Sequence, residues 1–526
     1  MMQNQLQTFS YGEEHLTAAK ALQLARGTLR GVFSNTTREK VLQSAGHVSA
    51  MVERGAPVYG INTGFGPLCT TSISKEETAV LQTNILKSHS VGVGTPLSTE
   101  LAKLMLILKL HSLAKGHSGI QLETLERILW HIEADAIPMV PSQGSVGASG
   151  DLAPLAHLFL PLLGLGKIKF QDKEISGQEV LALHAMQPLT LAPKEGLALI
   201  NGTQFILAHA VLVVARFQNC LKQADIIGAM MLEGLQGSIS PFSAALHALR
   251  PFKGNQHVAG RIRTLLRGSE ILEDHVDCDR VQDPYSLRCM PQVHGASRNS
   301  WLHLKELVEI ELNAVTDNPV ILDEYQAVSG GNFHGQPLAM ALDYAALAAS
   351  ELGNISDRRI YLALEGGHGV PELLMKDTGI NSGYMILQYT SAALASENKS
   401  LCFPASADSI PTSMGQEDHV SMGSISGRKA LQILENLEKI LAIELLTAAQ
   451  AFEFRKPLKS GILLDKAHQV VRKHVAFAEE DRVFSDDIQE ALQLIQSAAI
   501  PKEIEQLMRE KNITWETLHC EEFETI

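Results

Sequence analysis

Apolar residues return along most of this chain with the spacing of one face of an α-helix. Between Arg428 and about Phe452, leucines and alanines recur every three or four residues, which predicts a long amphipathic helix. Residues 101–110 and 122–134 are also expected to be helical. Residues 338–352 and 384–400 are rich in Ala and Leu and apolar nearly all round. Helices of that kind are usually surrounded by other helices, within a bundle or between subunits.

The longest apolar run covers residues 197–214 and contains Asn201, Gln204 and His209. Polar groups at those positions favour a buried core helix and argue against a membrane span. Alternating strand patterns are scarce and short, as at residues 320–322. The sequence therefore predicts an all-α protein, with a loop-rich helical region on the N-terminal side and a long central helix bundle from about residue 200.

Composition narrows the class of protein further. Hydrophobic residues make up 45% and charged residues 19% of the 526 residues, which is typical of a globular chain. The formal net charge of −14 argues against nucleic acid or an anionic membrane as a partner. The N-terminus has no basic start and no apolar signal core, and the cysteines form no CxxC pair, so we expect a cytoplasmic protein with reduced thiols. The six cysteines are Cys69, Cys220, Cys278, Cys289, Cys402 and Cys520.

Residues 144–157 contain three consecutive small residues, Ala148, Ser149 and Gly150, that can form an electrophile from backbone atoms. The Gly150 nitrogen can close onto the Ala148 carbonyl carbon to give a five-membered ring. Loss of two waters, one of which carries the Ser149 hydroxyl, then leaves an exocyclic methylidene. Glycine is needed because a Cβ would block so close an approach. Since no ordinary side chain is a strong electrophile, such a ring would serve as a cofactor.

The same residues also fit an ordinary loop that leads into a helix, with Asp151 at its N-cap. Two better-known motifs do not fit this segment. A phosphate loop needs a lysine after its glycines, and a nucleophile elbow needs glycine where Asp151 stands.

Seven further motifs accompany this segment along the chain. They are residues 59–66, 195–204, 282–288, 316–319, 329–334, 381–385 and 416–420. Taken in this order with residues 144–157, they resemble the aromatic amino-acid ammonia-lyases, from the Tyr59 loop to the Arg428 helix.

The resemblance implies a carbon–nitrogen lyase that removes ammonia without oxidation and leaves an α,β-unsaturated acid. Its cofactor would be a 4-methylidene-imidazol-5-one formed from Ala148, Ser149 and Gly150, with no diffusible cofactor and no metal. A bond between the substrate amine and the methylidene would make the amine a better leaving group. The histidines in the motifs lack the spacing of a metal site such as HExxH. These are His157, His334 and His419.

Positions that match the family's motifs carry implied roles. Tyr59 is the candidate base for the β-proton, provided that its phenol lies near positive charge or helix N-termini; otherwise it is a buried, hydrogen-bonded tyrosine. Arg288 is the candidate clamp for the substrate carboxylate, with a plain salt bridge as the alternative. Asn201, Gln282 and the catalytic candidate Tyr285 are expected to line the electrophile and the amine or carboxylate end.

Three more residues bear on the substrate ring. Phe333 is expected to form a wall of the ring pocket. His89 and Glu417 can hydrogen-bond an imidazole, whereas a benzene ring would leave them without partners at a cost of about 1–3 kcal/mol each. The resemblance therefore implies histidine as the substrate, with a tyrosine or phenylalanine lyase or aminomutase as the alternative. Departures from the histidine-type pattern occur at Ser90, Cys402, Phe403, Met414 and Gly415.

The resemblance also implies a homotetramer whose active sites draw motifs from several subunits. We expect the lyase domain to cover residues 8–485 and a C-terminal helical extension to cover residues 486–526. Two readings from other classes are a catalytically silent scaffold of the same fold and a metal-dependent hydrolase.

Overall fold

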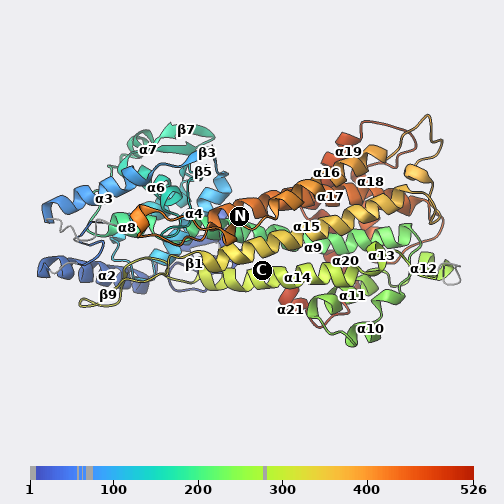
Figure 1. The fold of residues 1–526 in the computed structure, drawn as a ribbon, viewed down its shortest axis with the longest axis horizontal. Coiled ribbons are helices and arrows are strands. Elements are labelled where there is room, and N and C mark those ends of the chain that lie inside the picture. The colour runs from blue at the N-terminus through green and yellow to red at the C-terminus, as the bar shows by residue number, and fades with distance from the viewer. Residues whose placement is uncertain (1–6, 56–57, 62, 65, 67–74, 276–280) are drawn as a thin grey trace, which may run out of the picture.

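Long helices connect the two ends of an elongated molecule (Figure 1). The computed structural model describes residues 7–55, 58–61, 63–64, 66, 75–275 and 281–526. The central helices are α9 (Gln204–Gly234), α14 (Met290–Leu312), α15 (Gln336–Leu364), α16 (Met385–Leu401) and α17 (Gly423–Glu453).

The centre of this bundle is closely packed. Nearly every side chain of α9 is buried, and Leu437 and Leu441 of α17 are fully enclosed. Small residues let the helices approach: a Cβ at Gly427 of α17 would lie 2.8 Å from the His209 Cβ of α9. The bundle also contains the ion pair between Arg359 of α15 and Glu444 of α17, in which Nη2 and Oε2 are 3.1 Å apart.

One end of the molecule is built from short helices and small sheets (Figure 1). The strands are β1 (Thr8–Ser10) parallel to β2 (Arg30–Val32), β3 (Val93–Pro96) antiparallel to β5 (Pro141–Gln143), the antiparallel set β4 (Ile137–Pro138), β6 (Lys167–Phe170) and β7 (Lys173–Ser176), and the pair β8 (Val320–Ile321) and β9 (Ala327–Val328). The helices are α1 (Ala18–Ala25), α2 (Asn35–Arg54), α3 (Lys75–His89), α4 (Thr99–Leu113), α5 (Leu122–Glu133), α6 (Leu152–Phe159), α7 (Gly177–Leu183) and α8 (Glu195–Ile200).

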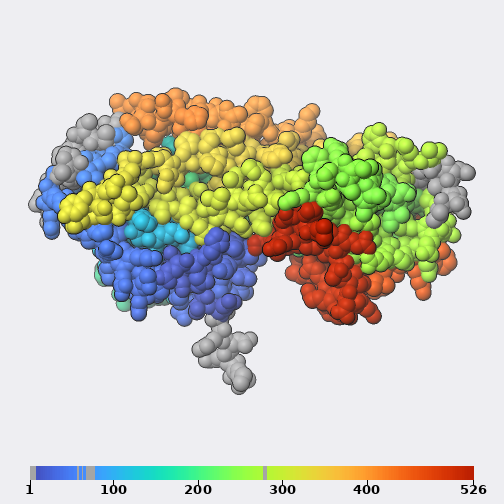
Figure 2. Space-filling view, turned by 90° about the horizontal axis from the view of Figure 1, so that it is seen from below, coloured from blue at the N-terminus to red at the C-terminus, as the bar shows by residue number. Residues whose placement is uncertain are grey.

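The opposite end holds the connections between the central helices and the C-terminal region. Its helices are α10 (Ala244–Ala248), α11 (Lys253–Leu265), α12 (Glu270–Asp274), α13 (Tyr285–Arg288), α18 (Ile462–His474), α19 (Phe484–Gln496), α20 (Ala499–Lys511) and α21 (Cys520–Phe523). In the space-filling view the red C-terminal segment lies against the green segment that contains α11 (Figure 2).

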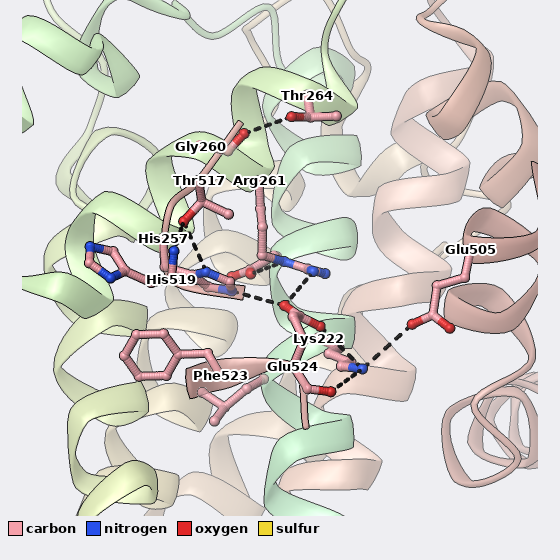
Figure 3. Close-up of polar contacts among 12 residues, drawn as sticks. Lys222, His257, Gly260, Arg261, Thr264, Glu505, Thr517, His519, Phe523 and Glu524 are labelled. Atoms are coloured by element: carbon pink, nitrogen blue, oxygen red, sulfur yellow. Dashed lines mark hydrogen bonds and ion pairs between the residues drawn. The ribbon is translucent and has the colours of Figure 1, made fainter. Parts of the chain in front are cut away.

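The last residues of the chain pack against α9 and α11. Phe523 is fully buried, and the Glu524 carboxylate pairs with His257 at 2.8 Å, Arg261 at 2.7 Å and Lys222 at 3.1 Å (Figure 3). Burial would raise the pKa of Glu524, but the charge of Arg261 and its other partners hold this pKa well below the usual range. The C-terminal end is therefore anchored to the bundle by largely buried charges.

The helices expected from periodicity are confirmed. Residues 101–110, 122–134, 338–352, 384–400 and 428–452 lie almost entirely within α4, α5, α15, α16 and α17. Residues 320–322 contain the short strand β8.

The prediction of one continuous helix over residues 197–214 is wrong. The apolar run 197–214 is divided between α8 and α9, because the chain turns at Asn201 and Gly202, where Gly202 has a φ of +118°. Helix α9 is long and apolar enough to cross a membrane, but 83% of its most apolar window is buried inside the protein, as expected for a core helix. Of the cysteines, Cys220, Cys289, Cys402 and Cys520 are free, while Cys69 and Cys278 lie outside the described residues.

Candidate active site

The chain before α6 is bent at the three residues that can form the ring. Ser149 has a φ of +49° and Gly150 a φ of +79°, which is the left-handed region that favours glycine. This bend is held by the peptide at the α8–α9 turn: Gly202 N–H donates to the Ser149 carbonyl at 3.2 Å, and Asp151 N–H donates to the Gly202 carbonyl at 2.8 Å. A Cβ on Gly150 would lie 2.1 Å from the Gly202 oxygen, so only glycine fits there.

This arrangement fits a ring formed from Ala148, Ser149 and Gly150. Gly150 pairs with Gly202 in a short parallel bridge, whose two hydrogen bonds join Gly202 to the Ser149 carbonyl and the Asp151 N–H on either side of Gly150. The Gly150 nitrogen is therefore not used in this pairing. The chain is already folded back at the residues whose nitrogen and carbonyl carbon would join.

Asp151 joins the loop to the long central helix. Its carboxylate accepts hydrogen bonds from the Phe205 and Ile206 N–H groups, both at 3.0 Å, at the start of α9. Burial raises the pKa of Asp151 to about 7, and the hydrogen bonds from Ile206, Ser145 and Phe205 oppose that rise. The expected capping of the following helix is corrected: Asp151 occupies the N-cap position of α6, but its side chain caps α9.

Glu417 approaches the loop from the segment before α17. Its Oε1 accepts a hydrogen bond from the Ser149 hydroxyl at 3.4 Å. Its Oε2 accepts from the Thr412 and Ser413 hydroxyls, both at 2.9 Å, so that two bonds fix the orientation of the carboxylate. Glu417 is therefore the predicted site residue with a direct bond to Ser149.

His89 ends α3 on the same side of the molecule. Its Nδ1 lies 3.1 Å from the Ser88 hydroxyl. Burial lowers the pKa of His89, whereas its hydrogen bond with the Ile85 backbone and the charge of Glu417 act to raise it. The neighbouring Ser90 hydroxyl donates to the Leu86 carbonyl at 2.7 Å.

Tyr59 and Phe333 also belong to this end. The Tyr59 hydroxyl accepts from the Gly66 N–H at 3.3 Å, and Tyr59 packs against the main core; residues 62 and 65 of its loop lie outside the described residues. Phe333 lies two residues before Gly335, where a Cβ would be 2.6 Å from the Ile206 Cδ1. Its loop therefore packs against the first turn of α9, next to Asp151.

The other three predicted residues lie elsewhere. Gln282, Tyr285 and Arg288 are in or beside α13, whereas α6 and α8 are at the opposite end of the long axis (Figure 1). Tyr285 is 70% exposed, and the Arg288 guanidinium lies 4.5 Å from the centre of its ring, with Nε donating to the Asp283 carbonyl at 2.9 Å.

Helix α15 explains this separation. Its first turn follows the Phe333 loop, and Arg359, 23 residues after Gln336, donates to the Ser286 carbonyl of α13 at 3.3 Å. At 1.5 Å per residue, that interval corresponds to roughly 35 Å. A single chain therefore does not bring Arg288 to Ser149.

The structure also accounts for the histidines in the motifs. His157 Nε2 accepts from the Gly92 N–H at 3.0 Å, and His334 Nε2 lies 3.3 Å from the His419 carbonyl. Within the part of the chain that the structure describes, no group of three or more His, Cys, Asp or Glu side chains could hold a metal ion. Two departures from the histidine-type pattern, Phe403 and Met414, are 82% and 93% exposed.

Sequence reasoning missed Lys109 and Asp317. Lys109 lies on α4 and donates to the Asn201 carbonyl, while Asp317 binds Lys194 at 2.6 Å. A signal was available for Lys109, because a lysine in the middle of an apolar run is rarely buried without a partner.

The fold and this loop together define the class of protein. The chain belongs to the aromatic amino acid lyase family, whose profile it matches over residues 16–473. Members of this family use a methylidene-imidazolone group, and the chain is a carbon–nitrogen lyase.

Within the family, the chain is similar to histidine ammonia-lyases. It is 46% identical to the one from Natranaerobius thermophilus over 481 residues, which are 91% of this chain and 95% of the relative. The crystal structure of histidine ammonia-lyase from Trypanosoma cruzi matches with a TM-score of 0.89 and 40% identity, covering 98% of this chain and 97% of that one. Tyrosine aminomutase from Streptomyces globisporus is more distant in sequence, at 34% identity with a TM-score of 0.88, over 94% and 97% of the two chains.

Proposed function

We propose that this protein is a cytoplasmic histidine ammonia-lyase that converts L-histidine to trans-urocanate and ammonia. The observation that carries the proposal is the position of Glu417, whose carboxylate bonds to the Ser149 hydroxyl in the bent loop. A carboxylate beside the reacting residue can accept a hydrogen bond from an imidazole N–H, which a phenyl ring cannot offer.

The cofactor of this reaction is the methylidene-imidazolone formed from Ala148, Ser149 and Gly150, and it supplies the electrophile that the side chains lack. Gly202 and Asp151 hold its three residues through the backbone. Asn201 lies beside them, and its Nδ2 donates to the Asn318 carbonyl at 3.0 Å, which fixes the direction of its amide oxygen.

The remaining residues bind the substrate and move one proton. Glu417 and His89 hold the imidazole, and Phe333 packs against it. Tyr59, a partly buried side chain that packs against the main core, removes the β-proton at its phenolate oxygen. Arg288 binds the carboxylate with its planar guanidinium, with Tyr285 and Gln282 beside it.

The last three residues act in a site completed by other subunits of a homotetramer. Helix α15 separates α13 from Ser149 within one chain, and it carries exposed apolar side chains. An exposed apolar helix face of this kind is suited to contact between subunits. These side chains are Met340, Tyr344, Leu347 and Tyr361.

Two measurements on the purified chain test the proposal. Intact mass reports the ring, because its formation removes two waters from the chain. Absorbance of urocanate reports turnover of L-histidine, with L-tyrosine and L-phenylalanine as parallel substrates and assays for both ammonia and β-amino acid products. We expect a mass deficit of two waters and a preference for histidine. A chain of full mass, or one that prefers tyrosine or phenylalanine, contradicts the proposal.

A further inference from the structure

A buried lysine lies directly beneath the candidate active site. Lys109 is 1% exposed on α4, and its ammonium donates a hydrogen bond to the Asn201 carbonyl. Burial lowers the pKa of Lys109 to about 8; the charges of Asp317 and Asp151 act to raise this pKa, and the charge of Lys194 lowers it further. None of the roles proposed above uses this cation, although enclosing a charge among apolar helices is costly.

The peptide that Lys109 holds is the one that holds the loop. The Asn201 carbonyl and the Gly202 N–H belong to the same planar peptide group and point in opposite directions. Lys109 binds the Asn201 oxygen of this group, and the Gly202 N–H of the same group donates to the Ser149 carbonyl at 3.2 Å. Fixing the oxygen therefore fixes the direction of the N–H.

The Asn201 side chain is anchored as well. Its Nδ2 donates to the Asn318 carbonyl at 3.0 Å. The Asn318 N–H donates to Asp317 at 2.7 Å, and the other Asp317 oxygen pairs with the fully buried Lys194 at 2.6 Å. Asp317 thus pairs with Lys194, whereas the Lys109 ammonium binds the Asn201 carbonyl.

We infer that Lys109 is a positioning residue for formation of the prosthetic group: it orients the Asn201–Gly202 peptide so that this peptide holds Ser149 in the bend from which the ring closes. The inference rests on the proposed function only for the identity of the ring. A charged donor orients its acceptor more strongly than a neutral donor does, and it polarises the N–H of the same peptide.

The step that depends on this orientation is ring closure. The Gly150 nitrogen forms a bond to the Ala148 carbonyl carbon, and the carbonyl oxygen leaves as water with the protons of the two amide nitrogens. The Ser149 hydroxyl then leaves with the Ser149 α-proton as a second water, which creates the methylidene. No oxidant or reductant is required.

The test compares Lys109→Met and Lys109→Arg with the parent and with Lys103→Met. Lys103 is a matched control because it is also a buried lysine of α4, but it pairs with Asp135, away from the loop. Intact mass is followed over time after synthesis, and circular dichroism reports the fold. We expect ring formation in Lys109→Met to be about tenfold slower than in the parent, with the lost rate largely restored in Lys109→Arg and unchanged in Lys103→Met.

A folded Lys109→Met chain that loses two waters as fast as the parent overturns the inference. Should Lys109→Met fail to fold, Lys109→Gln takes its place with the same expectation. Loss of the fold in both variants also overturns it, because Lys109 would then support the fold and not the loop. If the parent forms the ring but does not deaminate histidine, the proposed substrate is wrong, and the comparison of ring formation still decides the role of Lys109.

Discussion

The candidate site residues at the two ends of the long axis of the molecule are held in different ways. At one end, Ser149 and Gly150 are held in a bend by backbone bonds to Gly202, beneath which Asp151 and Lys109 are fully enclosed. At the other end, Tyr285 is exposed and Arg288 contacts Asp283 and Tyr285 of its own short segment. The contrast teaches that the bend at Ser149 and Gly150 is organised within one chain, whereas Arg288, the proposed carboxylate-binding residue, lies at the opposite end of the molecule (Figure 1) and would need a neighbouring subunit's loop to act on substrate.

The largest effect is expected from Gly150→Ala. Its Cβ would lie 2.1 Å from the Gly202 oxygen, in backbone that cannot give way. We expect a chain of full mass and histidine turnover at background. Gly27→Ala is the matched control, because Gly27 also has a positive φ, of +71°, but has open space around the added Cβ. Normal ring formation in Gly150→Ala would show that the loop is not held as tightly as its hydrogen bonds indicate.

The separation of the two ends can be tested by mixing inactive chains. Ser149→Ala lacks the electrophile, and Arg288→Ala is expected to lose about 2–5 kcal/mol of transition-state binding. If active sites combine Ser149 of one subunit with Arg288 of another, co-expression at equal amounts restores about one quarter of the sites. Each variant expressed alone serves as the control. Co-expressed chains no more active than the separate variants would contradict shared sites.

A smaller effect is expected at the substrate ring. In Glu417→Gln the accepting carboxylate becomes an amide of the same shape. We expect kcat/KM for histidine to fall by an amount that corresponds to a loss of about 1–3 kcal/mol of transition-state binding. Turnover of phenylalanine is not expected to fall with it. Glu435→Gln, an exposed position on α17, is the control. An equal loss for both substrates would assign Glu417 to the prosthetic loop and not to substrate choice.

The last effect concerns the pH dependence of stability at the end of the molecule that holds Asp151. Because the folded protein raises the pKa of Asp151 from 3.8 to about 7, the folded state binds this proton more tightly than the unfolded state. The stabilisation is present below about pH 4 and is lost as the pH rises to about 7, at about 1.4 kcal/mol per unit. We expect Asp151→Asn to lack this slope in denaturant unfolding, and the exposed Asp172→Asn to keep it. If the free energy of unfolding changed with pH equally in Asp151→Asn and the parent, the raised pKa of the buried Asp151 carboxyl would be contradicted.

The central bundle was predictable from sequence because its helices are long and their apolar positions periodic. The break at Asn201 and Gly202 was not, since two polar or small residues inside an apolar run do not reveal a turn without the loop that pairs with it. The motifs were sufficient to predict the candidate site residues from the sequence. The length of α15 places these residues at two opposite ends of the molecule, and no motif contains that length. The contact between Asp151 and the start of α9 was also not predictable, because Phe205, whose N–H binds Asp151, lies 54 residues later in the sequence.

Helix α15 has a consequence for how the protein behaves in dilute solution. In the proposed tetramer, a subunit freed from its neighbours would keep its own Ser149 loop, but its own Arg288 would lie at the opposite end of the molecule (Figure 1). Specific activity would then follow the law of mass action and fall on dilution below the dissociation constant of the assembly, while the absorbance of the ring stays constant.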